Sequence, residues 1–161
     1  MRESDATALR EVWDNDRDRL WRALLAWSAD SEITSDAIAE AFAQAAPRVG
    51  TIRNLDRWIW RAAFKIAAGM LAARRETAHV GRGPELERAS SSSQLPEEAA
   101  ELVDALAKLS EDDRLTIVLC QIGGWSASEV GGLVGAAPGT VRVRLHRAKS
   151  KLRRIMEATD D

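Results

Sequence analysis

The sequence has few of the residues from which catalytic and metal sites are usually built. It contains one cysteine, Cys120, and two histidines, His79 and His146. A single thiol excludes an internal disulfide framework and a cysteine-rich metal site. No paired carboxylates, nucleophile triad, phosphate-binding loop or metal-ligand spacing can be assembled from the other residues with any specificity. We therefore expect no metal and no other cofactor, and we do not expect the chain itself to be an enzyme.

Long apolar runs and strand patterns are also missing. The sequence has no run of 18 apolar residues that could cross a membrane and no signal-peptide pattern, so we expect a cytoplasmic protein without membrane insertion. Its β-branched residues are scattered, and no alternation of apolar and polar residues persists. Apolar residues recur instead at spacings of three and four, which is typical of helices. The sequence therefore predicts an all-α fold.

A segment of different composition divides the predicted helices into two groups. Residues 77–95 hold two glycines, a proline and four consecutive serines, with almost no periodic apolar residues. Such a segment buries too little apolar surface to offset the entropy lost on ordering, so we expect a flexible linker. The sequence therefore predicts two small helical domains, residues 1–76 and 96–156.

Three amphipathic helices are predicted before the linker. The first carries apolar residues from Leu9 to Trp27, the second begins at Ser35, and the third begins after Asn54. Residues 48–54 are polar and are predicted to form a loop between the second and the third helix. The apolar stripe of the third helix consists of Leu55, Trp58, Ile59, Ala62, Ile66 and Met70.

Residues 126–154 are the most informative stretch of the chain, because two helix signals there are separated by a turn of about four residues. Ser126 and Glu129 have the spacing of a capping box. Gly135 suits the left-handed residue that ends a helix, and Pro138 suits the first turn of the next one. With two further helices predicted after residues 96 and 110, this pattern predicts a four-helix domain that ends in a helix-turn-helix.

The last predicted helix is strongly basic. Between residues 138 and 156 it has seven arginines and lysines and no acid, although the formal net charge of the whole chain is −2. Its apolar residues recur on one face, which can pack inward while the other faces present cations, as a recognition helix requires. An ordinary basic surface helix is the competing interpretation. On the recognition-helix interpretation, the residues that face base edges are Arg142, Val143, His146 and Arg147, and those that contact phosphates are Thr140, Arg144, Lys149 and Lys151.

These patterns together resemble the extracytoplasmic-function (ECF, group IV) sigma factors of the sigma-70 family. Members of that family keep a promoter-opening domain and an upstream-element-binding domain, joined by a linker. In the second domain the resemblance is carried by Gly124-Trp125-Ser126 and by Pro138-Gly139-Thr140-Val141-Arg142. In the first domain it is carried by Asp36-Ala-Ile-Ala-Glu40-Ala-Phe42 and by Trp58-Ile-Trp60-Arg61.

The resemblance implies that the chain binds core RNA polymerase and promoter DNA, both double-stranded and melted, and that an anti-sigma protein regulates it. It places Asp36, Glu40 and Phe42 on the polymerase clamp, although Phe42 also suits a core position. It places Arg48 and Arg53 beside the displaced DNA strand, and Trp60 and Arg61 at the melted promoter. Residues two apart on a helix face different sides, and Trp58 fits the apolar stripe. Trp60 is therefore the better candidate for DNA contact.

Several positions depart from the family pattern. A glutamine is usual at Ala39, an arginine-asparagine pair at Phe64-Lys65, and an acid near Gly69. At Ala137 the family usually has serine, so the basic helix lacks a side-chain N-cap worth about 1 kcal/mol. These departures leave three hypotheses open: a working sigma factor, a degenerate adaptor that binds polymerase or an anti-sigma protein without melting promoters, and a conventional helix-turn-helix regulator.

Overall fold

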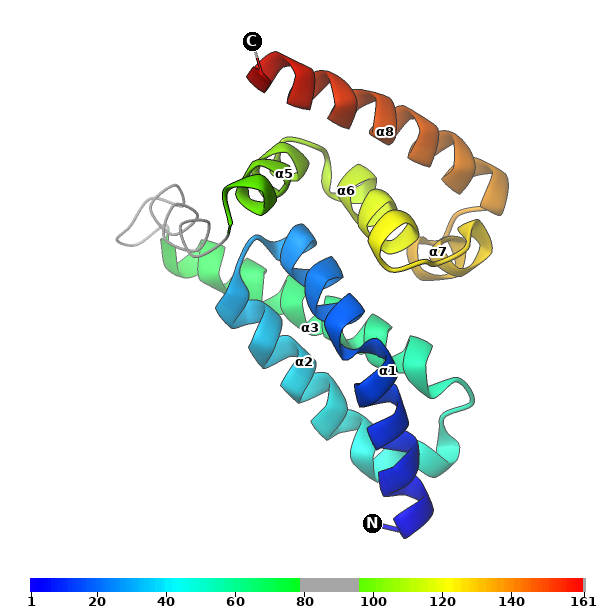
Figure 1. Ribbon diagram of the computed structural model, residues 1–161. Coiled ribbons are helices and arrows are strands. Elements are labelled where there is room, and N and C mark those ends of the chain that lie inside the picture. Colours follow the sequence, from blue (N-terminus) through cyan, green and yellow to red (C-terminus); the bar gives the residue numbers. More distant parts are fainter. Residues whose placement is uncertain (79–95, 161) are drawn as a thin grey trace.

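The computed structural model describes residues 1–78 and 96–160 of the chain. These residues are helical with short connections, and none of them lies in a strand, which confirms the all-α prediction. Figure 1 shows α1, α2 and α3 as one bundle and α5 to α8 as a second group that packs on it. The elements are α1 (Glu3–Ser28), α2 (Ser31–Ala45), the 3₁₀ helix η1 (Ala46–Thr51), α3 (Leu55–Ala78), α5 (Glu97–Ala107), α6 (Glu111–Ile117), the π-helical turn η2 (Val118–Ile122), α7 (Ala127–Val134) and α8 (Pro138–Asp160). The predicted linker, apart from its first two residues, lies outside the described residues, as does His79.

The junction of α1 and α2 lies closer to the N-terminus than the sequence analysis placed it. Ala29 takes a left-handed conformation (φ 58°), which turns the chain directly after α1. The Asp30 carboxylate then accepts a hydrogen bond from the Ile33 amide (2.9 Å) and caps α2. The predicted start at Ser35 is therefore wrong by about one helical turn, because the cap is Asp30 and not the later Ser35-Asp36 pair.

Residues 48–54 are only partly the loop that the sequence predicts. Residues 46–51 form η1, with Pro47 in its first turn, where a proline has no amide to lose. The Thr51 hydroxyl donates a hydrogen bond to the Arg48 carbonyl (2.8 Å) at the end of this 3₁₀ helix. Arg48 and Arg53 are both exposed.

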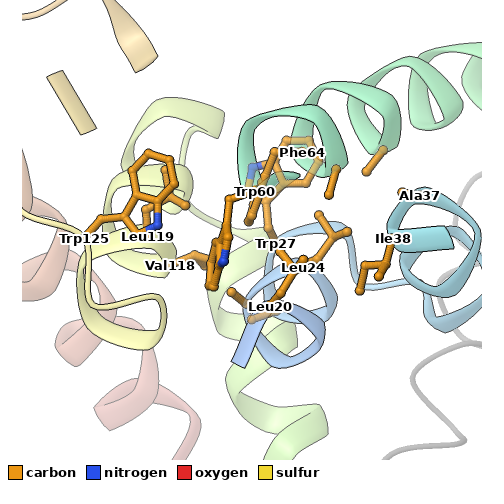
Figure 2. Close-up of a cluster of buried hydrophobic side chains, with 14 of the residues drawn as sticks. Leu20, Leu24, Trp27, Ala37, Ile38, Trp60, Phe64, Val118, Leu119 and Trp125 are labelled. Atoms are coloured by element: carbon orange, nitrogen blue, oxygen red, sulfur yellow. The ribbon is translucent and has the colours of Figure 1, made fainter. Parts of the chain in front are cut away.

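A single apolar core runs through both groups of helices. Figure 2 shows Trp60 between the α1 residues Leu24 and Trp27 on one side and Val118, Leu119 and Trp125 on the other. We call the contact of Trp27 and Trp60 with Val118, Leu119 and Trp125 the seam. All five side chains of the seam are buried, so the two groups of helices pack closely in this arrangement.

The seam changes which face of α3 is buried. The predicted stripe includes Trp58, Ala62 and Ile66, but these three residues are only half-buried. The buried residues of α3 are Ile59, Trp60, Ala63, Phe64 and Ala67. The buried face is displaced from the predicted stripe because α3 packs mainly against α1 and α2, while Trp60 also meets Trp125 of the C-terminal group.

Candidate nucleic-acid interface

Hydrogen bonds between residues close in sequence, together with two glycines, shape the helix-turn-helix. The Glu129 amide donates to the Ser126 hydroxyl oxygen, and the Ser126 amide donates to the Glu129 carboxylate, both at 3.1 Å, so the predicted capping box is present. Gly135 ends α7 in the left-handed conformation (φ 74°), as predicted. Gly131 was not predicted to matter, but a Cβ at this residue would lie 2.3 Å from the Ala136 carbonyl oxygen. A side chain at residue 131 would therefore force the turn open.

One face of α8 anchors the helix, and the opposite face is open. Val141 and Ala148 are fully buried, while Leu145 and Leu152 are half-buried on the same side. Val143 is 51% exposed, which is unusual for a large apolar side chain on a helix. Of the residues predicted to contact DNA on α8, Arg144 is half-buried and the others are exposed: Thr140, Arg142, Val143, His146, Arg147, Lys149 and Lys151.

The surface beside the first turns of α8 is hollowed and mostly cationic. An open depression of about 450 Å³ is lined by Thr140, Val143, Arg144, Arg147 and Lys151, with Asp113 of α6 on its other side. Lys151 Nζ lies 3.3 Å from Asp113 Oδ2, so an acid from a neighbouring helix pairs with one of the predicted phosphate-binding cations. A phosphate at Lys151 would have to compete with this carboxylate.

A second cationic surface lies where α3 meets the C-terminal group. An open groove of about 940 Å³ has Arg48, Trp58, Arg61 and Lys65 on the N-terminal side, and its other wall is apolar and includes Leu133 and Val134 of α7. The Arg48 guanidinium carbon lies 6.0 Å from the centre of the Trp58 ring. The structure therefore brings Arg48 and Arg61 together and adds Trp58, which the sequence analysis had assigned to the core.

Trp60 is the DNA-contact prediction that this arrangement contradicts. Its side chain is 0% exposed, and its indole nitrogen donates a hydrogen bond to Asp16 Oδ2 (2.8 Å). The centre of its ring lies 6.0 Å from that of Trp125 across the seam. A base cannot stack on Trp60 here, because residues of the C-terminal group cover the face of α3 from which it projects.

The residues predicted to bind polymerase lie on α2. Asp36 and Glu40 are exposed, and Glu40 accepts a hydrogen bond from Gln44 (3.0 Å). Phe42 is half-buried and packs edge-on against Trp13 of α1, with ring centres 5.0 Å apart. Phe42 therefore contributes to packing between α1 and α2 while part of it remains accessible.

The charged groups on the edge of the seam are paired. The Arg57 guanidinium binds the Glu129 carboxylate, with a second contact of 3.4 Å from Nη2 to Oε1. Desolvation alone raises the pKa of Glu129, but the hydrogen bonds from Arg57 and Ser126 and the charge of Arg57 outweigh it and hold the pKa below its ordinary value. The capping box and the seam thus share the Glu129 carboxylate.

The remaining features of the described residues do not indicate a second kind of site. Cys120 is half-buried, and burial raises the pKa of its thiol although the charge of Lys149 opposes the shift. In the described part of the chain, no three His, Cys, Asp or Glu residues lie together so as to hold a metal ion. Within the same residues, no helix is both long enough and apolar enough to cross a membrane.

Comparison with known proteins places this geometry in a family. Residues 99–152 match the family described as Sigma-70, region 4. The chain is 28% identical over 166 aligned positions to the ECF RNA polymerase sigma factor SigL of Mycobacterium tuberculosis, covering 96% of this chain and 92% of SigL. The C-terminal group of helices therefore matches sigma-70 region 4, and the chain as a whole is similar to an extracytoplasmic-function sigma factor. Over 55 residues the chain is 46% identical to the RNA polymerase sigma factor CarQ of Myxococcus xanthus, an alignment that spans 34% of the chain and 32% of CarQ.

Two solved structures share the fold of this chain. The sigma factor RpoE from Bartonella quintana, in complex with the anti-sigma factor NepR, superposes on this chain with a TM-score of 0.69 at 17% sequence identity. The alignment covers 97% of this chain and 98% of the RpoE chain. CnrH, in complex with the cytosolic domain of CnrY, superposes on this chain with a TM-score of 0.73 at 20% sequence identity. The alignment covers 95% of this chain and 90% of the CnrH chain. Both likenesses extend over the N-terminal and the C-terminal group of helices.

Proposed function

We propose that this chain is a working sigma factor that binds core RNA polymerase in the cytoplasm, directs it to specific promoters and helps to open the DNA. The observation that carries the proposal is the open face of α8. It presents cations and Val143 on the second helix of a helix-turn-helix whose first helix has a complete capping box. Arg142 and Arg147 donate to base edges, Val143 and His146 lie beside them, and Thr140, Arg144 and Lys149 contact phosphates.

The N-terminal group has the second DNA-binding task in this proposal. Residues 1–76 bind polymerase and melted DNA, residues 77–95 link the two domains, and residues 96–156 bind the upstream promoter element. Arg48, Arg53 and Arg61 are exposed and lie where they can bind the phosphates of a displaced strand. Asp36, Glu40 and the accessible part of Phe42 contact the polymerase clamp. Because each domain binds DNA weakly alone, tethering both to polymerase raises the local concentration of each at its promoter element.

An anti-sigma protein is the regulatory partner that we propose. RpoE and CnrH, which share this fold, were each solved in complex with a partner protein: the anti-sigma factor NepR and the cytosolic domain of CnrY, respectively. Both likenesses cover almost the whole of this chain, so both of its helix groups have counterparts in those complexes. We propose that such a partner holds this sigma factor away from polymerase.

A degenerate adaptor is the second candidate, and the position of Phe64 favours it. The family usually has an arginine-asparagine pair at Phe64-Lys65, but Phe64 is buried here against Trp27 and Trp60, with ring centres 5.7 and 6.4 Å away. A polar contact to melted DNA is thereby replaced by core packing. An adaptor would bind polymerase or the anti-sigma protein without melting promoters.

Run-off transcription distinguishes these functions. Purified core polymerase and the promoter upstream of this protein's own gene are combined with and without the protein. A specific transcript that depends on the protein supports the sigma factor. Co-elution with core polymerase without a transcript supports the adaptor, and a shift of free duplex DNA without polymerase binding supports a conventional regulator.

A further inference from the structure

Val143 is an apolar side chain in the middle of a cationic surface. It is 51% exposed, whereas a large apolar residue on a packed helix is ordinarily buried. Figure 1 shows α8 at the outer edge of the C-terminal group, with one side turned away from the other helices. A β-branched valine is also a weaker helix former than alanine or arginine. Neither packing nor helix propensity therefore accounts for a valine at this position.

Helical spacing sets Val143 at the centre of the face that α8 presents to solvent. Val141 and Leu145 anchor α8, and Val143 is two residues from each, which places it about 200° around the helix from both. Arg147 follows Val143 by four residues and Thr140 precedes it by three, so these side chains share its face. All three line the open depression of about 450 Å³ beside the first turns of α8. A ligand on this face therefore meets one apolar side chain among hydrogen-bond donors.

The DNA major groove offers one partner for such a side chain. Base edges there present hydrogen-bond donors and acceptors, and a single apolar group, the 5-methyl group of thymine. A hydrogen-bonding edge placed against Val143 would lose its water without gaining a partner, which weakens binding. A methyl group placed there buries apolar surface of both molecules, which strengthens binding. The valine therefore favours thymine at the base pair that it faces.

We infer that Val143 is a specificity-determining residue that reads the 5-methyl group of one thymine in the upstream promoter element. The inference rests on the proposed function and adds to it the chemical group that this position of α8 recognises. Arg142 and Arg147 read hydrogen-bonding edges in that proposal. Val143 distinguishes thymine from pyrimidines that lack the methyl group.

Replacing thymine by deoxyuridine tests the inference, because it removes the methyl group and leaves every hydrogen-bonding atom of the base in place. The promoter upstream of this protein's own gene is prepared as a set of duplexes. In each duplex, one thymine of the upstream element, on either strand, is replaced by deoxyuridine. Holoenzyme assembled from core polymerase and the full chain is titrated against each duplex, and the dissociation constant is measured.

We expect one position at which deoxyuridine weakens binding of the wild-type holoenzyme about fourfold, which corresponds to one buried methyl group. Val143→Ala should weaken binding to the thymine duplex by about the same factor. This variant should then be insensitive to deoxyuridine at that position, because the two changes remove the same contact. Val143→Ala is expected to fold, since the side chain is exposed and alanine favours a helix.

Lys149→Ala is the matched control on the same helix, since Lys149 is exposed and is assigned to a phosphate. A phosphate contact does not sense the base, so this variant should weaken binding to both duplexes equally and keep the fourfold difference between them. A further pair of duplexes carries cytosine or 5-methylcytosine at the sensitive position. The wild type should prefer 5-methylcytosine about fourfold, and Val143→Ala should bind both alike, which separates the methyl group from the carbonyl oxygen of thymine.

Two results would overturn the inference and leave the proposed function standing. The first is specific promoter binding with no thymine at which deoxyuridine changes the dissociation constant. The second is a sensitive thymine to which Val143→Ala responds as the wild type does, because another residue then reads the methyl group. If the holoenzyme does not distinguish the promoter from a duplex of scrambled sequence, the proposed function fails and the inference fails with it.

Discussion

The helices α3 and α8, to which we assign DNA contacts in the two halves of the molecule, are packed in opposite ways. α8 is held by one narrow stripe that includes Val141 and Ala148, so its cations stay on the surface. α3 is held on several sides, by α1 and α2 and by the seam, so Trp60 is buried although Arg61 beside it is exposed. A helix at the edge of a fold can therefore present a whole face of charged residues, whereas a central helix exposes only the side chains that its neighbours leave uncovered.

Trp60→Ala should lower the free energy of unfolding more than any other change considered, because Trp60 is the fully buried side chain that distinguishes α3 from α8. Removing a fully buried tryptophan costs about 3–5 kcal/mol, and it leaves the Asp16 carboxylate without the indole donor. Trp58→Ala, at a half-buried position on the same helix, should cost about 1–2 kcal/mol. Urea denaturation of both variants measures the difference. Equal losses would mean that the two faces of α3 are buried alike.

Arg142→Ala and Arg147→Ala should each reduce promoter-specific binding by about 1–3 kcal/mol, since a bidentate contact with guanine has that value. Transcription from the specific promoter reports the loss, and a pull-down with core polymerase should be unchanged. Arg10→Ala on α1 is the control for removal of an exposed arginine. If polymerase binding fell as much as promoter binding, the division of tasks between α8 and α2 would be wrong.

Two glycine substitutions should change stability in opposite directions. Gly123→Ala places a Cβ against Trp60 and the Leu119 carbonyl, and it should destabilise the fold by about 1–3 kcal/mol. Gly69→Ala lies in α3 with nothing within 4 Å of the added Cβ, and it should stabilise the helix by about 0.5–1 kcal/mol. Thermal and urea denaturation give both signs. A neutral Gly123→Ala would show that the seam is looser than its geometry indicates.

Ala137→Ser should strengthen α8 without touching its binding face. The Ala137 carbonyl already accepts a hydrogen bond from the Val141 amide (3.1 Å), but alanine has no side chain with which to cap the helix. A serine there adds an acceptor for the first-turn amides and should stabilise the protein by about 1 kcal/mol. Ser126→Ala is the reverse change at the capped helix α7 and should destabilise by a similar amount. Urea denaturation is the measurement, and a lower stability of Ala137→Ser would contradict the capping argument.

The pH dependence of the seam should be the smallest effect, because Glu129 is partly exposed. Its folded-state pKa is held below the ordinary value, so the carboxylate contributes stability above the unfolded-state pKa of about 4.3. That contribution is lost as the pH falls through the folded-state pKa. The difference in free energy of unfolding between wild type and Glu129→Gln should therefore shrink from pH 7 to about pH 3.5. A difference that stays constant over this range would show that the charge of Glu129 is not what stabilises the pair.

Much of the C-terminal group could be predicted from the sequence, because its signals are local. The capping box of Ser126 and Glu129, the left-handed Gly135 and the start of α8 at Pro138 all depend on residues within one or two turns. The apolar spacing of α8 likewise predicts its buried side. Gly131 was missed because its requirement comes from a carbonyl oxygen in the turn that follows α7.

The burial of α3 could not be predicted in the same way. Helical spacing gave a stripe through Trp58 and Ala62, which is the side that would be buried in an isolated amphipathic helix. A helix that packs on several sides has no single stripe, and nothing close to Trp60 in the sequence indicates that Trp125 covers it. The predictions for the two tryptophans were therefore exchanged: Trp60, which was predicted to contact DNA, is buried, and Trp58, which was predicted to lie in the core, is half-buried.

The sequence by itself determined that this chain is helical, that it ends in a basic helix-turn-helix, and that it resembles a sigma factor, because caps, turns and apolar periods act between near neighbours in the chain. Only the tertiary structure decided that the two helix groups share a core and that Arg57 binds Glu129. These contacts join residues far apart in sequence, and their free energy depends on shape and desolvation at a surface that exists only after both groups have folded.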